Sequence, residues 1–347
     1  MLKLKYMFEN FELARLALEH WEHDSEYLDE YLKYFRISSN AVYPFSVRGK
    51  RHFLRLSPVE EKQKENLVGE LEFLQYVRNA GYPAMKPVEA KNGEVLLTLD
   101  TEWGSYYASV FEGVPGTCIE DTDYREEVML AYGKALGWLH QLSKEYMPMQ
   151  KKWSYREALV WVRKVLEEHL ASVTCKEQEA EKDKERKQSV TLEKMLAEAE
   201  QVEQELSGLE CTKETFGLVH YDFEPDNVFY IKEDGSCHVI DFEDGMYHFF
   251  LVDVEQVLDA LCGELEGEAL AQAKKYFLQG YESEKALEPD FEQKLPLMRR
   301  FCNLYSYARL IHCLAEEVPE SPEWMVKLRN ILTRKVKYLE KCVIAKE

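Results

Sequence analysis

The stretch "LVHYDFEPDNVFY", residues 218–230, constrains the chain most, because packing alone does not require its order of polar residues. Asp222 stands five residues before Asn227, and a proline between them prevents a regular helix or a central strand. Two apolar-rich runs follow, 228–232 and 237–241, joined by "EDGS". An Asp-Gly pair in so short a gap is typical of a β-hairpin. The sequence therefore predicts an irregular polar loop that leads into a hairpin.

A second aspartate, Asp241 in "HVIDFED", ends the second run of this hairpin. Pairing centred on the Asp-Gly turn places Val228 opposite Asp241. Asn227 then lies opposite Phe242, and directly opposed Cα atoms are about 4.5–5.5 Å apart. Asn227 and Asp241 therefore lie at the same open end of the hairpin, where an amide oxygen and a carboxylate can bind one cation. Oxygen ligands that leave room for water and phosphate are typical of Mg²⁺ sites. Asp222 is a carboxylate positioned to accept a proton from an attacking hydroxyl.

Taken singly, these residues have ordinary explanations as a capping aspartate, a turn asparagine and an aspartate that ends a strand. Taken together, D-x-x-x-x-N, a hairpin and then D-F form the catalytic-loop and metal-loop arrangement of kinase-type phosphoryl transfer. The sequence contains no Walker A motif, which argues against a different class of NTPase. We therefore expect a phosphotransferase that uses ATP and Mg²⁺.

The length and composition limit the classes of function. A chain of 347 residues can bury a large core and form two lobes or domains, and 46% hydrophobic and 12% aromatic residues indicate a folded protein. The net charge of −20 argues against a nucleic-acid-binding surface, which needs clustered Lys and Arg. The charge suits a cationic substrate, but many soluble proteins are simply acidic, so it leaves the substrate open.

Signals for membranes, metals and disulfides are weak. No segment reaches the roughly 18 consecutive apolar residues of a membrane span, and the opening "MLKLKYMFENFELAR" has no signal-peptide pattern. The eight cysteines show no C-x-x-C pair or zinc-ligand spacing. His312 and Cys313 are adjacent, and such neighbours point apart on a helix, so core packing explains them. We expect free thiols in a cytoplasmic protein without a membrane or nucleic-acid partner; the oligomeric state is open.

The first 110 or so residues predict a mostly antiparallel sheet with one internal helix. Apolar residues fall near helical spacing over residues 8–34. Two alternating runs, 41–47 and 52–56, flank an "RGK" turn and predict a hairpin. Residues 61–82 predict the internal amphipathic helix, closed by Gly81.

Further along the chain the hydrophobic period changes. Residues 85–116 are strand-rich around an Asn-Gly turn, and residues 124–142 predict a helix. Residues 154–208 carry leucines at helical intervals, and "KEQEAEKDKERKQ" within them is polar on all faces, which predicts a solvated helix end or a loop between two helices. Residues 253–347 read as helical throughout, so the only strand signals in this half are the two runs of the hairpin.

At this point the chain resembles a known group. "HYDFEPDNVFY…HVIDFED" looks like the "HGDxxxxN…ID" signature of the aminoglycoside phosphotransferase and choline kinase-like superfamily, the phosphotransferase enzyme family. Its members have a protein-kinase-like fold and phosphorylate small-molecule hydroxyls, or occasionally protein side chains. The resemblance implies an α+β, two-lobed fold with a small antiparallel-sheet N-lobe over 1–112 and a larger, mostly helical C-lobe over 113–347. A charged helical insertion at about 150–215 belongs to the C-lobe.

The resemblance also implies an ion pair at the nucleotide phosphates. "RHFLRLS" is similar to the third N-lobe strand, where the family carries a Lys or Arg on the phosphates, which implies this role for Arg55. "GELEFLQYV" is similar to the helix whose glutamate pairs with that cation, which implies Glu70, while Glu72 faces away by helical geometry. Without the resemblance, Arg55 reads as a surface residue at an edge and Glu70 as a charge on an exposed helix face.

The remaining roles follow from the same match. "SVFEGVPG" resembles the hinge between lobes, which implies that Phe111, Glu112 and Gly113 contact the adenine, with hydrogen bonds from the backbone of the last two; alone, this segment reads as a turn. The match further implies that Asp222 is the catalytic base, that Asn227 and Asp241 are Mg²⁺ ligands, and that His220 and Asp253 are structural.

Two features depart from the family pattern. Tyr221 stands where the family most often has glycine, so the loop must accommodate a bulky side chain. A Gly-rich phosphate loop is also missing, and "ISSNAVYPF" instead offers Ser39 and Asn40, whose short side chains and backbone N–H groups can cover phosphates. The gap from Asp241 to Asp253 is too short for a long activation loop, so we expect no switching by loop phosphorylation.

The acceptor is predicted only as a class, a hydroxyl of a small molecule. An amine or amino-alcohol would suit the acidic chain, as in aminoglycoside, choline or homoserine kinases, while sugars and protein Ser/Thr stay open. Helices over 154–208 and 290–316 are expected to wall the pocket, with Tyr305, Arg309 and His312 as contacts, although core packing explains those three equally well. The alternative is a silent pseudokinase that binds nucleotide as a scaffold; the intact Asp-Asn-Asp set argues against it, and Tyr221 and the missing glycines argue for it.

Overall fold

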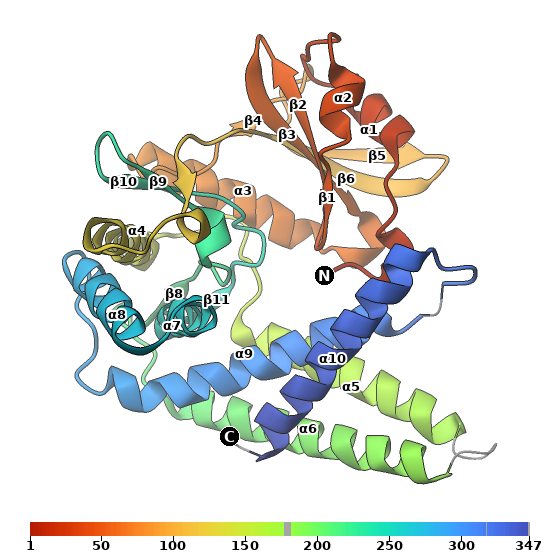
Figure 1. Cartoon of the computed structure of the whole chain (residues 1–347), viewed down its shortest axis with the longest axis vertical. Helices are drawn as coiled ribbons and strands as arrows, with labels where there is room; N and C mark the ends of the chain where they lie inside the picture. Colours follow the sequence, from red (N-terminus) through yellow and green to blue (C-terminus); the bar gives the residue numbers. More distant parts are fainter. Residues whose placement is uncertain (177–181, 317, 346–347) are drawn as a thin grey trace. The chain divides into compact units, whose positions relative to one another are not determined.

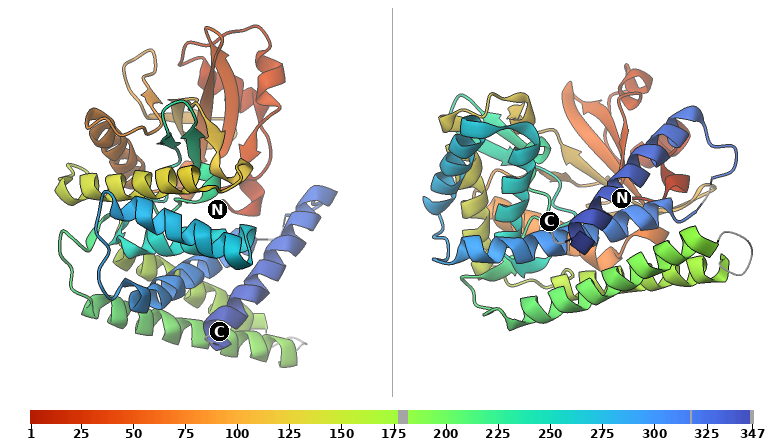
Figure 2. Two further views of the ribbon diagram at one scale, coloured as in Figure 1. Left: turned by 60° about the vertical axis from the view of Figure 1, so that its left-hand side comes forward. Right: turned by 60° about the horizontal axis from the view of Figure 1, so that its bottom comes forward.

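The computed structural model describes residues 1–176, 182–316 and 318–345, and it divides into two compact units (Figures 1 and 2). The larger unit comprises Phe8–Lys152 and Cys211–Phe291, and the remaining described residues form the smaller one. The predicted lobe boundary between residues 112 and 113 lies inside the larger unit and stays a prediction. Every residue of the predicted catalytic and nucleotide site belongs to the larger unit.

A six-stranded antiparallel sheet forms one part of the larger unit. Its order is β1 (Arg36–Ile37), β2 (Ala41–Val47), β3 (Lys50–Pro58), β6 (Gly104–Glu112) and β4 (Pro87–Val88), and β5 (Leu97–Thr101) also pairs with β6. The predicted β2–β3 hairpin is confirmed, with a second strand longer than expected. Arg48 and Gly49 both have positive φ, 51° and 74°, which is the two-residue turn that matches the twist of a hairpin.

The prediction of one continuous helix over residues 8–34 is wrong. The structure has α1 (Phe11–Leu18) and α2 (Leu28–Leu32) with a break between them. Asp24 in the break explains it, because its carboxylate accepts hydrogen bonds from the hydroxyl of Ser46 and from the backbone N–H groups of Arg48 and Gly49, at 2.8–2.9 Å. The helix is therefore interrupted where Asp24 binds the β2–β3 turn.

The other early predictions agree with the structure. Helix α3 (Lys64–Asn79) ends as expected, with Gly81 at φ 87° and its N–H donating to the carbonyl of Arg78 at 2.9 Å. Apolar residues of α3 are buried in the core cluster that also includes residues of the 228–239 hairpin; those of α3 are Leu71, Phe73, Leu74 and Val77. The Asn-Gly turn also forms, since the N–H of Gly93 donates to the carbonyl of Ala90 at 2.8 Å.

Helices and short strands complete the larger unit. They are η3 (Ile119–Asp121), α4 (Glu126–Glu145), α7 (Leu251–Glu264) and α8 (Gly267–Glu282), with β7 (Thr117–Cys118), β8 (Phe216–Leu218) and β11 (Tyr247–Phe249). The three strands were not predicted, because two or three residues are too few to show a period of two. Strand β8 pairs with β11, and β7 joins the edge of the hairpin. Helices α4 and α8 pack at glycines, where a Cβ on Gly133 would lie 1.9 Å from the carbonyl oxygen of Phe277.

The register of the β9 (Val228–Ile231) and β10 (Ser236–Val239) hairpin corrects the prediction. Val228 lies opposite Val239, not Asp241, and the N–H of Ile240 donates to the carbonyl of Asn227 at 3.0 Å, so Asn227 is not opposite Phe242. The cause is a loop that begins one residue earlier than expected, with the N–H of Gly235 donating to the carbonyl of Ile231 at 2.9 Å. The slip of two residues keeps each side chain on its expected face.

The smaller unit is built from four helices, α5 (Tyr155–Lys176), α6 (Lys182–Gly208), α9 (Phe291–Leu314) and α10 (Glu323–Ala345), with the 3₁₀ turn η1 (Leu4–Tyr6). Helices α5 and α6 lie side by side in both Figure 1 and Figure 2. Arg300 of α9 pairs with Glu198 and Glu205 of α6, at 2.5 and 2.8 Å. The polar run "KEQEAEKDKERKQ" falls partly on residues 177–181, which lie outside the described residues.

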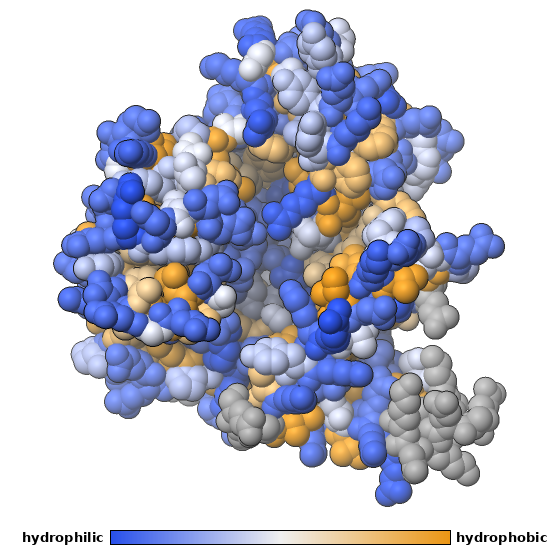
Figure 3. Space-filling view, in the orientation of Figure 1, coloured by the Kyte–Doolittle hydropathy of each residue, from blue (hydrophilic) through white to orange (hydrophobic). Residues whose placement is uncertain are grey.

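The surface is rich in polar side chains, and the face in Figure 3 is mostly hydrophilic with separate hydrophobic patches. This agrees with a chain in which 31% of the residues are charged. The cysteines whose side chains the structure describes are free thiols. Among the described helices, none is both long enough and apolar enough to cross a membrane.

Candidate active site

Asp222 and Asn227 are joined directly by a hydrogen bond. The 3₁₀ turn η4 (Pro225–Asn227) brings the Asn227 amide back to the loop, where its Nδ2 donates to Oδ2 of Asp222 at 2.8 Å and to the Asp222 carbonyl at 3.0 Å. Asn227 is buried and Asp222 is half-buried. Because Nδ2 is committed to Asp222, the amide oxygen of Asn227 is the atom that can ligate a cation, while the Asp222 carboxylate is held in one orientation.

His220 links the loop that carries Asp222 to the strand that leads to Asp241. Its Nε2 lies 3.0 Å from the carbonyl of Ile240, and its Nδ1 accepts the N–H of Asp222 at 3.2 Å. These two bonds require a neutral ring with the proton on Nε2. Burial lowers the pKa of His220 to about 4, despite the opposing charge of Asp253, so the ring is neutral near pH 7. The geometry agrees with the predicted structural role of His220, which stays a prediction.

Asp253 lies at the first turn of α7 and is fully buried. Its Oδ2 accepts the N–H of His220 and its Oδ1 the N–H of Tyr221, both at 2.8 Å. Nε2 of His140 on α4 lies 3.0 Å from Oδ2, and Nδ1 of His140 lies 2.9 Å from the hydroxyl of Tyr281. The sequence analysis missed His140, because a single histidine on the buried face of a long helix resembles any core residue.

The backbone at Tyr221 explains why glycine is usual at this position. Tyr221 has φ 61°, the left-handed conformation that glycine adopts at least cost. The Asp253 carboxylate accepts its N–H, and Nε2 of Gln256 donates to its carbonyl at 3.1 Å. The tyrosine side chain is buried. These contacts offset the strain of a left-handed non-glycine residue, which is of the order of 1–3 kcal/mol.

Asp241 begins the metal loop, which we define as residues 241–245. It also has φ 61°, and its N–H lies 3.4 Å from the Met85 sulfur. Desolvation by the surrounding protein raises the pKa of Asp241 to about 7; the Glu243 charge adds to the shift and Arg55 opposes it. A carboxylate whose charge is destabilised by burial and by neighbouring negative charge, taken together with the amide oxygen of Asn227, is a donor set that fits a hard divalent cation.

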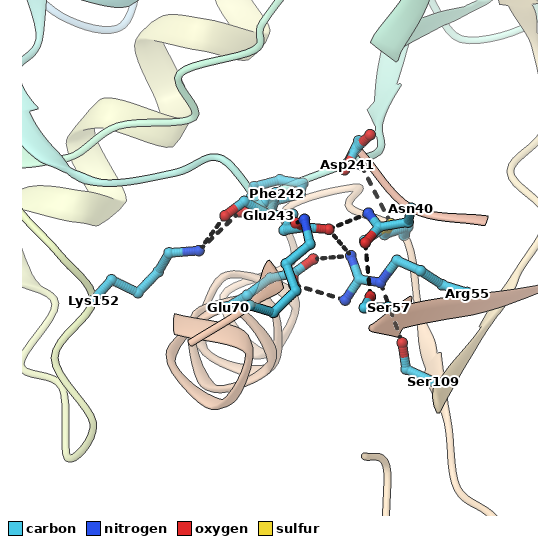
Figure 4. A network of polar contacts seen from close by, with 11 residues as sticks. Asn40, Arg55, Ser57, Glu70, Ser109, Lys152, Asp241, Phe242 and Glu243 are labelled. Atoms are coloured by element: carbon cyan, nitrogen blue, oxygen red, sulfur yellow. Dashed lines mark hydrogen bonds and ion pairs between the residues drawn. The ribbon is translucent and has the colours of Figure 1, made fainter. Parts of the chain in front are cut away.

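Arg55 and Glu70 form a buried, bidentate ion pair (Figure 4). Nη1 of Arg55 donates to Oε1 of Glu70 at 2.8 Å and Nη2 to Oε2 at 2.7 Å, while Nε reaches the Ser109 hydroxyl at 3.3 Å. The guanidinium lies 4.8 Å from the ring centre of Phe111. Burial alone would lower the pKa of Arg55, but the Glu70 carboxylate outweighs it and raises the pKa. The reading of these two residues as isolated surface charges is therefore wrong.

A further carboxylate, Glu243, was missed by the sequence analysis. Its side chain is buried and accepts hydrogen bonds from the ammonium of Lys62 and the amide of Asn40, and Arg55 lies 3.5 Å away. Ser57 fixes the Asn40 amide from the other side, at 2.7 Å. Burial would raise the pKa of Glu243, but the charges of Lys62 and Arg55 lower it below its ordinary value. No local motif signals this cluster, because Lys62 and Glu243 are 181 residues apart.

The predicted adenine segment forms the end of β6. The N–H of Glu112 donates to the carbonyl of Lys86, and the N–H of Gly113 donates to the carbonyl of Arg51, both at 2.9 Å. In a hydrogen bond between either residue and adenine, a carbonyl oxygen of the protein would therefore accept from the base, because both N–H groups are committed within the protein. The Glu112 side chain pairs with Lys86 at 2.5 Å.

Comparisons with known proteins decide the family. The model of the phosphotransferase enzyme family matches residues 35–287. The chain belongs to the phosphotransferase enzyme family. It is 22% identical over 291 residues to amicoumacin kinase of Bacillus subtilis (strain 168), which covers 80% of this chain and 79% of that one. It is 27% identical over 239 residues to homoserine kinase of Caulobacter vibrioides, which covers 68% of this chain and 67% of that one.

Solved structures carry the same fold. An amicoumacin kinase in complex with AMP-PNP, Ca²⁺ and Ami has a TM-score of 0.73 at 20% identity and covers 97% of this chain and 95% of that one. A microcompartment-associated aminopropanol kinase has a TM-score of 0.64 at 16% identity and covers 97% and 98%. The predicted α+β, kinase-like fold and the predicted family are confirmed. An ATP-binding phosphotransferase of the small-molecule kinase class, with an alcohol group as acceptor, is likewise confirmed.

Other predicted site residues keep their status as predictions. In this family member Ser39 lies in the β1–β2 turn, beside Asn40, whose side chain is engaged by Ser57 and Glu243. Tyr305, Arg309 and His312 lie on α9 of the smaller unit. The Trp161 ring lies 5.7 Å from the Tyr305 ring and 5.6 Å from the His312 ring, between ring centres.

Proposed function

We propose that the protein transfers the γ-phosphoryl group of ATP, with Mg²⁺, to the hydroxyl of a small amine or amino-alcohol. One observation carries the proposal: the 2.8 Å hydrogen bond from the Asn227 amide to the Asp222 carboxylate, at the end of the hairpin where Asp241 emerges. A base, a neutral oxygen ligand and an anionic oxygen ligand thus come from one loop and one hairpin. Kinase-type phosphoryl transfer uses this set of groups.

Asp222 acts on the acceptor. Its carboxylate takes the proton of the acceptor hydroxyl as the hydroxyl oxygen bonds to the γ-phosphorus and the bond from that phosphorus to the ADP oxygen breaks. The Asn227 amide keeps the carboxylate in place. Asp253 holds the backbone N–H groups of His220 and Tyr221, and His220 holds that of Asp222, so the base is preorganised by four bonds of 2.8–3.2 Å.

The other residues bind and orient the nucleotide. Arg55 and Glu70, with Ser39 and Asn40, are proposed at the phosphates, and residues 111–113 at the adenine. The amide oxygen of Asn227 and the carboxylate of Asp241 would hold Mg²⁺. When bound, this ion neutralises charge on the β- and γ-phosphate oxygens.

The acceptor class rests on chemistry that the relatives' names share. Homoserine and aminopropanol both carry an amine and a hydroxyl, and kinases of these two compounds are among the similar proteins. The net charge of −20 favours the approach of a cationic acceptor. We therefore place amino-alcohols ahead of sugars and protein side chains.

The test is an ADP-release assay with MgATP and a panel of acceptors: homoserine, aminopropanol, choline, an aminoglycoside, a neutral sugar and a Ser/Thr peptide. We expect turnover with one or more of the amines. Asp222→Asn should lower kcat by roughly 10²–10⁴-fold, because a positioned base contributes about that factor, while nucleotide affinity stays unchanged.

Three outcomes contradict parts of the proposal. Turnover of Asp222→Asn equal to that of the natural chain refutes the role of Asp222. Turnover only with the sugar or the peptide refutes the amine acceptor. Tight nucleotide binding that does not depend on Mg²⁺, with no ADP released in the presence of any acceptor or by hydrolysis, supports the nucleotide-binding scaffold instead.

A further inference from the structure

Lys152 is a lysine in an unusual place. Its side chain is only 4% exposed, although lysine is almost never fully buried without a specific partner. Its ammonium donates to two consecutive backbone carbonyls of the metal loop, to Glu243 at 2.7 Å and to Phe242 at 3.3 Å (Figure 4). These carbonyls belong to the two residues that directly follow Asp241.

Helix α3 is shaped to receive this lysine. A Cβ on Gly69 would lie 2.6 Å from Cγ of Lys152, so only glycine leaves room for the aliphatic stem. Three residues along the helix, the Glu72 carboxylate accepts the backbone N–H groups of Met149 and Gln150, at 2.7 and 2.8 Å. The segment that carries Lys152 is therefore fastened to α3 at its backbone and at the stem of its side chain.

Within the part of the chain that the structure describes, the other backbone contacts of the metal loop are weak. The N–H of Gly245 donates to the carbonyl of Phe242 at 3.2 Å, and the N–H of Asp241 lies 3.4 Å from the Met85 sulfur. Asp241 is in a left-handed conformation that a non-glycine residue keeps only when its surroundings fix it. The Glu243 side chain is held by Lys62 and Asn40, whereas the charged Lys152 ammonium reaches the backbone carbonyls of the loop from outside it, at 2.7 and 3.3 Å. Charge-assisted hydrogen bonds are stronger than neutral ones.

We propose that Lys152 is a positioning residue for phosphoryl transfer: through its bonds to the metal-loop backbone it fixes the orientation of the Asp241 carboxylate toward the metal. This inference rests on the proposed function, which supplies the metal. Lys152 acts through Asp241 and touches neither nucleotide nor acceptor. Gly69 also contributes, because the space beside it lets the Lys152 ammonium reach the carbonyls of the metal loop.

The test measures nucleotide binding, not turnover. The affinity for AMP-PNP is determined by calorimetry with and without Mg²⁺, and the ratio of the two values gives the enhancement by the metal. In Lys152→Met, which keeps the stem and removes the charge, we expect this enhancement to fall about tenfold, the effect of losing a charge-assisted hydrogen bond. The affinity without Mg²⁺ should stay unchanged, and Lys152→Arg should restore part of the enhancement.

Lys151→Met is the matched control, since Lys151 is exposed and its amine lies only over the Tyr247 ring, at 5.3 Å. It should leave the enhancement unchanged. Gly69→Ala should lower the enhancement in the natural chain and have a smaller effect in a Lys152→Ala background, where the 2.6 Å contact with the lysine stem is gone and the 3.0 Å contact with the Gln150 carbonyl stays. A purely structural role predicts a lower melting temperature with an unchanged enhancement.

The possible failures are distinct. Full Mg²⁺ enhancement in folded Lys152→Met refutes the inference about Lys152 and leaves the proposed function standing. No enhancement in the natural chain refutes the proposed function itself. If Lys152→Met does not fold, Gly69→Ala and Lys152→Arg test the inference instead. The first keeps the ammonium and shifts its position, and the second keeps the positive charge as a guanidinium.

Discussion

The replacement of Glu70 by glutamine tests how the buried ion pair of Arg55 and Glu70 is held. Glu70→Gln keeps the shape of the side chain and removes its charge, which leaves the guanidinium of Arg55 buried. Removing one partner of a buried pair costs about 3–5 kcal/mol, because an uncompensated charge stays in the protein interior. Glu243 lies 3.5 Å from Arg55 and compensates part of the charge, so we expect the lower end, about 3 kcal/mol.

The assay is thermal unfolding by calorimetry. A loss of 1 kcal/mol lowers the melting temperature of a domain of 150–250 residues by about 2–4 °C, so Glu70→Gln should lower it by about 6–12 °C. Asp29→Asn is the matched control. Asp29 pairs with Arg15 at 2.8 Å in the same unit, but with exposed side chains. An exposed pair contributes at most about 1 kcal/mol.

The double variant separates charge from packing. Replacing both Arg55 and Glu70 by methionine removes both charges and keeps much of the volume, and such exchanges are often nearly neutral for stability. We therefore expect the double variant to be more stable than either single one. Equal shifts for Glu70→Gln and Asp29→Asn, or additive losses in the double variant, would refute the reasoning from burial.

Three further predictions follow from individual contacts. Asp241→Asn should abolish the Mg²⁺ enhancement of AMP-PNP binding in calorimetry and keep metal-free affinity. Burial lowers the pKa of His248 to about 3. Because unfolded histidine takes a proton below about pH 6.5, this residue makes stability fall by about 1.4 kcal/mol per pH unit between 6.5 and 3. His248→Asn should therefore reduce the slope of melting temperature against pH, and the part that comes from buried His220 should stay. Gly133→Ala should unfold the protein or lower its melting temperature sharply, since its Cβ would meet Phe277 at 1.9 Å, whereas Gly263→Ala, with nothing within 4 Å, should be neutral or stabilising.

The sequence was informative wherever the chemistry lies within a short segment. Asp222 and Asn227 are five residues apart, and the short turn between them brings their side chains into a direct hydrogen bond. Asp241 was placed at the same end of the hairpin as Asn227, because a short Asp-Gly loop can bring the two runs together in few ways. The exact register was wrong, because the position at which the loop begins is decided by one backbone hydrogen bond at Gly235.

The sequence was uninformative about partners that meet only in the fold. His140 and Asp253 are 113 residues apart, and Lys152 reaches the metal loop across 91 residues. Each of these side chains has an ordinary local context, on a helix face or in a polar connection. Burial of a charge is visible only when the element that covers it is known, so no spacing rule could have found them.

One turn of α3 connects these long-range contacts. Glu70 holds Arg55 on one side of the helix, and Glu72 holds the segment before Lys152 on another, as the angle of about 100° per residue requires. Gly69 lies between them and admits the lysine that supports the metal loop. A shift of α3 by one residue would turn all three positions away from their partners together. Arg55, the proposed phosphate-binding residue, and Asp241, the proposed metal ligand, therefore depend on the same helical register, although 186 residues separate them in the sequence.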